Sequence, residues 1–203
     1  MPSIKVADHQ FHYVQSGTFG RPILMLHSTG IGAWQWRRYS HLLSPRKTLA
    51  IDLLGYAPSD SWQGSGAPDC QLDFLAAEQL LLEQSGPIDV IGHSYGGFIA
   101  LRLAKKYPER VTSLLLHEPV AWGVLYDGEE PELELSFTQL CRQFFGEGPN
   151  INENKWLQHF VDYWNSPGTW LALPEKTKTL WIARFSKIYA EVSYLCLDRT
   201  PLS

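Results

Sequence analysis

The feature that most constrains this 203-residue chain is a glycine-rich turn around Ser94, in the run GHSYGG at residues 92–97. A short apolar run at 88–91 precedes the turn, and a helical pattern at 95–107 follows it. This order predicts a buried strand, a tight turn and a helix. It also predicts that the Ser94 hydroxyl is held away from the sheet, where a second molecule can reach it.

The two glycines that flank Ser94 fit such a turn. The residues two before and two after the serine are crowded, and a Cβ atom at Gly92 or Gly96 would clash. Ser94 also stands at a helix N-terminus, whose N–H groups and dipole favour negative charge. A simpler interpretation is a glycine turn with a solvent-facing serine. The strand before, the helix after and the third glycine, Gly97, favour a reactive serine instead.

Apolar runs and helical patterns alternate in the first part of the chain. Strands are predicted at 4–6, 11–14, 23–26, 48–51, 88–91 and 111–117, and helices at 32–43, 69–85 and 95–107. The first two strands are expected to form a hairpin. The order predicts an α/β fold with a mainly parallel sheet and helices on both faces.

The pattern changes after residue 132. Helices alone are predicted from there, at 133–145, 152–164 and 174–195. We therefore expect an α/β core over residues 1–128 and a helical cap over residues 129–203.

Composition and charge limit the kinds of partner and the location that we expect for the chain. The net charge is −4, which gives no reason to expect a nucleic acid or an anionic membrane surface as partner. No apolar run approaches a membrane span, and the first residues lack a secretion signal. Cys70, Cys141 and Cys196 are widely spaced, which favours free thiols in a reducing compartment. The expected location is cytoplasmic.

Three motifs resemble the α/β-hydrolase family. LHSTG at 26–30 looks like the family's His-Gly-x-Gly oxyanion loop, and DLLGYAPS at 52–59 is similar to its Asp-x-x-Gly-x-Gly-x-Ser loop. The third motif is the turn at Ser94, which resembles the family's nucleophile elbow. LLHEP at 115–119 and the tryptophan-bearing helical part add to the likeness, which runs over nearly the whole chain.

The chain departs from the family pattern in three places. Ser28 and Ala57 stand where the family usually has glycine, and Ser28 can narrow or re-aim the oxyanion loop. A family member would continue from about Ser203 into two more βα units of about 30 residues each. Those units normally carry the catalytic aspartate and histidine, so the chain resembles a hydrolase truncated before its last two strands. The strand at 111–117 would then be a sheet edge, open to self-association or to a partner.

The resemblance implies a role for each residue of the site. Ser94 is the nucleophile, and the backbone N–H groups of Tyr95 and Thr29 form the oxyanion hole, with Ser28 as the less favoured second donor. The supporting residues are His27, Gly92, His93 and Gly96. Glu118 is either the catalytic acid or a carboxylate that binds backbone N–H groups near Pro119, and the second alternative is favoured.

The catalytic base is the missing part. The seven histidines are His9, His12, His27, His41, His93, His117 and His159, and none follows a late strand. We predict that none of them is the base, so that activity is greatly reduced in the chain as given.

The expected activity is hydrolysis of a small hydrophobic ester or related acyl compound through an acyl-serine intermediate. Aromatic side chains of the helical part are expected to line an apolar pocket, apart from those that only pack helices: Trp122, Phe137, Phe144, Phe145, Trp156, Phe160, Trp164, Trp170 and Trp181. No cofactor and no metal is implied. The alternatives are a non-catalytic binding or assembly protein, and a C–C bond hydrolase or perhydrolase of the same fold.

Overall fold

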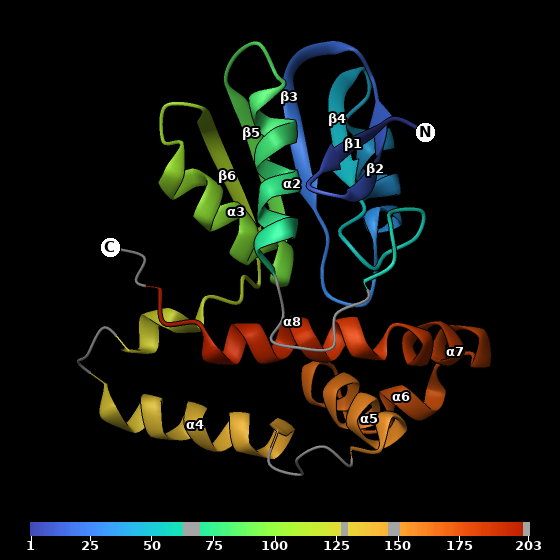
Figure 1. Cartoon of the computed structure of the whole chain (residues 1–203), viewed down its shortest axis with the longest axis vertical. Coiled ribbons are helices and arrows are strands. Elements are labelled where there is room, and N and C mark those ends of the chain that lie inside the picture. Colours follow the sequence, from blue (N-terminus) through green and yellow to red (C-terminus); the bar gives the residue numbers. More distant parts are fainter. Residues whose placement is uncertain (63–69, 127–129, 146–150, 201–203) are drawn as a thin grey trace. The chain divides into compact units, whose positions relative to one another are not determined.

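The computed structural model describes residues 1–62, 70–126, 130–145 and 151–200 (Figure 1). The chain forms two compact units, Met1–Ala121 and Trp122–Ser203. We call them the sheet unit and the helical unit and describe each by itself. The expectation that the second unit is a cap stays a prediction.

The sheet unit contains a six-stranded sheet in the order β1-β2-β4-β3-β5-β6 (Figure 1). Its strands are β1 (Ser3–Val6), β2 (His9–Ser16), β3 (Phe19–Leu26), β4 (Arg46–Ile51), β5 (Ile88–His93) and β6 (Val111–His117). The β1–β2 and β2–β4 pairs are antiparallel, and the β4–β3, β3–β5 and β5–β6 pairs are parallel. The predicted hairpin and the mainly parallel sheet are therefore confirmed.

The helices of this unit are η1 (Ala33–Trp36), α1 (Arg37–Leu42), α2 (Cys70–Leu82) and α3 (Tyr95–Lys106). Successive side chains of a strand point to opposite faces of the sheet. Ile23 and Met25 of β3 form a buried cluster with Ala33 and Trp36 of η1. Leu24 and Leu26, also fully buried, must therefore point to the other face. This alternation explains why residues 23–26 of β3 are apolar on both faces of the sheet, as expected for a sheet covered on both sides.

Strand β6 has a strand neighbour on one side only, β5, within the described part of the chain. Its side chains are exposed or half-buried, and Leu115 is 57% exposed. The apolar run at 111–117 suggests a buried strand, but apolarity alone cannot tell an interior strand from an edge.

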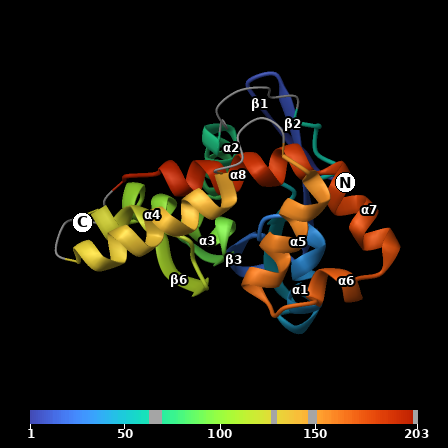
Figure 2. The ribbon, with the colours of Figure 1, turned by 90° about the horizontal axis from the view of Figure 1, so that it is seen from below.

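The helical unit contains η2 (Trp122–Tyr126), α4 (Pro131–Phe145), α5 (Glu153–Trp164), α6 (Thr169–Ala172), α7 (Glu175–Ala183) and α8 (Phe185–Leu197). Helix α5 packs against α6 and α7 (Figure 2). The core of the helical unit includes eight buried side chains of α4, α5, α6 and α8: Phe144, Trp156, Leu157, Phe160, Val161, Trp170, Ile188 and Val192.

The prediction of one helix over 174–195 is wrong. The chain turns at Arg184, where φ is −103° and ψ is 4°, and this residue ends α7 and precedes α8. The turn allows Trp181 of α7 to pack on Phe160, at 6.4 Å between ring centroids, while α8 presents its own buried stripe. Helix α6, a single turn, was not predicted.

No helix among the described residues combines the length and apolarity needed to cross a membrane.

Candidate active site

Ser94 occupies a strained turn between β5 and α3. Its φ is 52° and its ψ is −116°, a conformation that non-glycine residues rarely adopt. The Ser94 N–H donates to the His117 carbonyl at 3.0 Å, and the Ser94 carbonyl accepts from Phe98 N–H at 3.0 Å. The neighbouring strand and the first turn of α3 therefore hold the turn from both sides.

The two flanking glycines make this turn possible. A Cβ atom on Gly92 would lie 2.5 Å from the Gly96 carbonyl oxygen. A Cβ atom on Gly96 would lie 2.3 Å from the Leu26 carbonyl oxygen, at the end of β3. Both distances are far below van der Waals contact, so the elbow packs directly on its own backbone and on that of β3.

The loop after β3 presents three successive N–H groups with different partners. Ser28 N–H donates to Gln35 Oε1 at 3.0 Å, and Gly30 N–H donates to the Tyr56 hydroxyl at 2.8 Å. We find no acceptor for the buried Thr29 N–H among the described residues. A buried N–H group without a partner is rare, so Thr29 is the better placed of the two candidate donors to bind an external oxygen.

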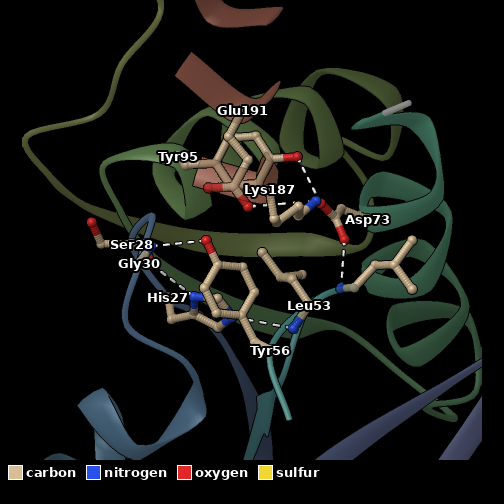
Figure 3. A network of polar contacts seen from close by, with 10 residues as sticks. His27, Ser28, Gly30, Leu53, Tyr56, Asp73, Tyr95, Lys187 and Glu191 are labelled. Atoms are coloured by element: carbon tan, nitrogen blue, oxygen red, sulfur yellow. Dashed lines mark hydrogen bonds and ion pairs between the residues drawn. The ribbon is translucent and has the colours of Figure 1, made fainter. Parts of the chain in front are cut away.

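His27 is held by both ring nitrogens (Figure 3). Its Nδ1 lies 2.8 Å from the Ser28 carbonyl oxygen, to which it must donate, so its Nε2 accepts from Leu53 N–H at 3.1 Å. The ring also packs edge-on against Tyr56, with centroids 4.6 Å apart. These contacts connect the loops after β3 and β4, and they leave no nitrogen with which His27 could accept a proton from Ser94.

Tyr95 is anchored by its side chain (Figure 3). The Tyr95 hydroxyl donates to Asp73 Oδ2 at 2.8 Å, and Asp73 Oδ1 accepts from Leu54 N–H at 2.8 Å. Tyr95 and Asp73 are both fully buried. Asp73 therefore links α2, the loop after β4 and the first residue of α3, and it fixes the backbone of Tyr95 at the helix N-terminus.

Gln35 connects the oxyanion loop to the elbow strand. Its Oε1 accepts from Ser28 N–H, so its Nε2 is the atom that faces His93 Nδ1, at 3.0 Å. An amide nitrogen can only donate, and His93 Nδ1 therefore accepts. The neutral ring then carries its proton on Nε2. Burial lowers the pKa of His93, the nearby His117 lowers it further, and the Glu118 carboxylate acts in the opposite direction.

His93, His117 and Glu118 form a cluster at the ends of β5 and β6. Their candidate ligand atoms lie within 4.8 Å of one another, and the two imidazole rings are 4.6 Å apart at their centroids. The residue types suit a metal ion. However, Gln35 occupies Nδ1 of His93, and Nε2 of the neutral ring bears the proton, so the cluster as it stands is suited to hydrogen bonding. Glu118 is exposed and has a φ of 45°.

The structure thus brings Ser94, Tyr95, Thr29 and their supporting glycines to adjacent ends of β3, β5 and β6. It adds Gln35, Asp73 and Tyr56, which sequence reasoning missed as parts of the site. In the motif at 52–59, Asp52 accepts from Ala33 N–H at 2.7 Å and holds a turn. Among the predicted pocket aromatics, Phe144, Trp156, Phe160 and Trp170 are core residues of the helical unit.

Comparison with known proteins agrees with this architecture. Residues 23–201 match the model of the alpha/beta hydrolase family, and the chain belongs to this family. The (lyso)-N-acylphosphatidylethanolamine lipase of Mus musculus is 38% identical over 109 residues, which are 50% of this chain and 30% of that protein. Lipase LipV of Mycobacterium tuberculosis is 37% identical over 107 residues, which are 52% of this chain and 39% of that protein.

The matched part thus spans about a third of the length of these curated relatives. Among solved structures, the epoxide hydrolase CorEH superposes with a TM-score of 0.67 at 19% identity, covering 94% of this chain and 72% of that one. The likeness to this structure concerns the fold alone. The chain is a hydrolase-family protein, as its motifs predict.

Proposed function

We propose that this chain carries the nucleophile and the oxyanion hole of a serine hydrolase that acts on small hydrophobic esters or related acyl compounds. The observation that carries the proposal is the positive φ of Ser94, 52°, at the start of α3. Such strain persists only where the surroundings impose it, and it is typical of functional sites.

The oxyanion hole rests on two backbone groups. Tyr95 N–H lies at the N-terminus of α3, next to the nucleophile, and Thr29 N–H lies on the loop after β3. Two donors of this kind stabilise the negative oxygen that forms when the Ser94 hydroxyl attacks a carbonyl. Each is typically worth about 3–4 kcal/mol of transition-state stabilisation. Asp73 and Gln35 act as positioning residues, through Tyr95 and through Ser28.

The rate of this chemistry depends on whether a base can deprotonate Ser94. Both ring nitrogens of His27 are engaged, and Nδ1 of His93 is held by Gln35. We therefore propose that Ser94 in this chain is positioned but deprotonated by neither His27 nor His93, and that Glu118 could orient a histidine only if one were supplied. An unassisted serine hydroxyl is a weak nucleophile at neutral pH.

The lipase relatives favour an ester substrate over other substrates of the family. The activity named for those lipases is theirs, and for this chain it supports only the substrate class. A serine at position 94, instead of an aspartate, argues against dehalogenase chemistry. The alternative is a binding or assembly protein that keeps the fold without turnover.

The test is hydrolysis of p-nitrophenyl acetate and p-nitrophenyl hexanoate with and without added imidazole. Because imidazole itself hydrolyses these esters, the rate with imidazole alone is subtracted. We expect slow release of p-nitrophenol, a further protein-dependent acceleration by imidazole, and loss of that further acceleration in Ser94→Ala. Alanine leaves the turn as strained as serine does, so the variant is a matched control. If imidazole has no Ser94-dependent effect while the hexanoate ester still binds, the binding-protein alternative is correct. Rapid turnover without imidazole would show that a base is already present.

A further inference from the structure

We propose that Cys141 and Cys196 form a reversible disulfide bond that covalently links α4 to α8 when the protein is exposed to a peroxide-class oxidant. The inference concerns the helical unit alone and is independent of the Ser94 chemistry. All three cysteines of the chain are free thiols in the structure.

The two thiols are brought together by the fold and not by the sequence. Cys141 lies near the end of α4 and Cys196 near the end of α8, and each thiol lies close enough to the other to shift its pKa. Both also line the same pocket of about 400 Å³. Cys196 is buried, and Cys141 is half-buried at the pocket.

The surroundings hold the pair in place. Arg199 donates to the Cys196 carbonyl oxygen at 3.0 Å, and its guanidinium lies 3.4 Å from the centre of the Tyr126 ring. A Cβ atom on Gly123 would lie 2.5 Å from the Thr200 carbonyl oxygen, so η2 packs closely on the segment after α8. Tyr126 in turn packs edge-on against Phe137 of α4, with ring centroids 6.1 Å apart. Helix η2 therefore contacts both α4, which carries Cys141, and the segment that follows α8, the helix that carries Cys196.

The order of events follows from access and charge. Burial raises the pKa of both thiols, but the nearby Cys196 thiol and the charge of Arg199 act to lower the pKa of Cys141 and favour its thiolate. Cys141 is therefore the sulfur that attacks first. Its thiol reacts with hydrogen peroxide to give a sulfenic acid and one water. The Cys196 sulfur then attacks the Cys141 sulfur, the S–S bond forms, and a second water leaves. Two thiols are oxidised by two electrons, and the peroxide is reduced to two waters.

The rate and the consequence are both measurable. Because the raised pKa values keep the thiolate fraction small, the oxidation rate should increase about tenfold per pH unit from pH 7 to 9. The bond closes a loop of about 55 residues that contains α5, α6 and α7. Closure of such a loop should lower the unfolding constant of the helical unit by about a thousand-fold.

The experiment treats the full chain with hydrogen peroxide, counts thiols in denaturant and maps disulfides by mass spectrometry. We expect free thiols to fall from three to one, with the mass of two hydrogen atoms lost and the bond mapped to Cys141 and Cys196. Dithiothreitol should restore all three. Cys141→Ser and Cys196→Ser should each prevent the bond, and Cys70→Ser, in the sheet unit, should leave it unchanged.

Three results would overturn the proposal. One is oxidation of Cys141 to a sulfinic acid without a bond to Cys196. The second is a disulfide that includes Cys70 or that joins two copies of the chain. The third is a mapped Cys141–Cys196 bond that leaves hydrogen exchange in α4 and α8 unchanged, because the bond would then not stabilise the two helices. None of these readouts depends on Ser94 activity.

Discussion

Replacing Gln35 with leucine should break the connection between the oxyanion loop and the elbow strand. The buried Ser28 N–H, in a residue 8% exposed, would lose its acceptor. A buried donor left without a partner costs about 1–3 kcal/mol. His93 also loses a donor, but its half-buried ring can bind water instead. We therefore expect Gln35→Leu to lower the free energy of unfolding by about 1–3 kcal/mol. With a urea m value of about 2 kcal/mol/M, the midpoint would fall by about 1 M.

Gln35→Glu is the matched control, because a carboxylate keeps an acceptor for Ser28 N–H. The unfolding free energy should stay close to that of the unmodified chain at pH 7. The same carboxylate would stand next to His93 Nδ1 and favour the protonated ring, so the pKa of His93 should rise from its lowered value. Urea titration followed by tryptophan fluorescence measures the first effect, and NMR titration of the histidine ring protons measures the second.

The two variants also separate stability from reactivity. Gln35→Leu loosens the loop that carries Thr29, so acylation of Ser94 by an activated ester should slow more than it does in Gln35→Glu. Unfolding of Gln35→Leu at the same urea concentration as the unmodified chain would contradict this connection. An unchanged pKa of His93 in Gln35→Glu would contradict it equally.

Three further predictions follow from the sheet unit. Tyr95→Phe removes one donor from Asp73 and should cost about 1–3 kcal/mol, whereas Asp73→Ala removes the acceptor of both the Tyr95 hydroxyl and Leu54 N–H and should cost more. The reverse order in urea denaturation would contradict the network. Since the pKa of His93 is lowered in the folded chain, unfolding takes up protons below about pH 6.5, so stability should fall as the pH decreases from 6.5 to the folded-state pKa and then level off. His93→Gln should remove that part of the pH dependence, and an unchanged profile would rule out His93 as its source. Leu115→Lys on the edge strand β6, where Leu115 is 57% exposed, should reduce concentration-dependent self-association in sedimentation velocity, and equal association in both proteins would place the interface elsewhere.

Local patterns were sufficient to predict the fold of the sheet unit. The strand–turn–helix order around Ser94 and the apolar runs at 23–26 and 48–51 depend on neighbours in sequence, and the family match confirms the fold class that they imply. The helical unit was less predictable. Nothing in the residues near Arg184 is a glycine or proline stop, so the break between α7 and α8 depends on packing against α5.

The supporting residues of the site escaped prediction for a related reason. Gln35 binds His93, which is 58 positions away, and Asp73 binds Tyr95, which is 22 positions away. A single sequence gives no signal for such pairs. The same holds for Cys141 and Cys196, which sequence spacing alone describes as unrelated thiols. The roles of Ser94, Thr29, Tyr95 and Glu118 stay predictions, and the strained φ of Ser94 is the strongest support for the first.

The most direct measurement of the central proposal is the mass of the protein after reaction with an activated ester such as p-nitrophenyl butyrate. A good leaving group lets an oxyanion hole acylate a serine without a general acid, and the lack of a histidine base that we propose would then slow deacylation. The account predicts a stable butyryl adduct that maps to the peptide containing Ser94 and is absent from Ser94→Ala. An adduct at another residue, or equal labelling of Ser94→Ala, would contradict the assignment of Ser94 as nucleophile.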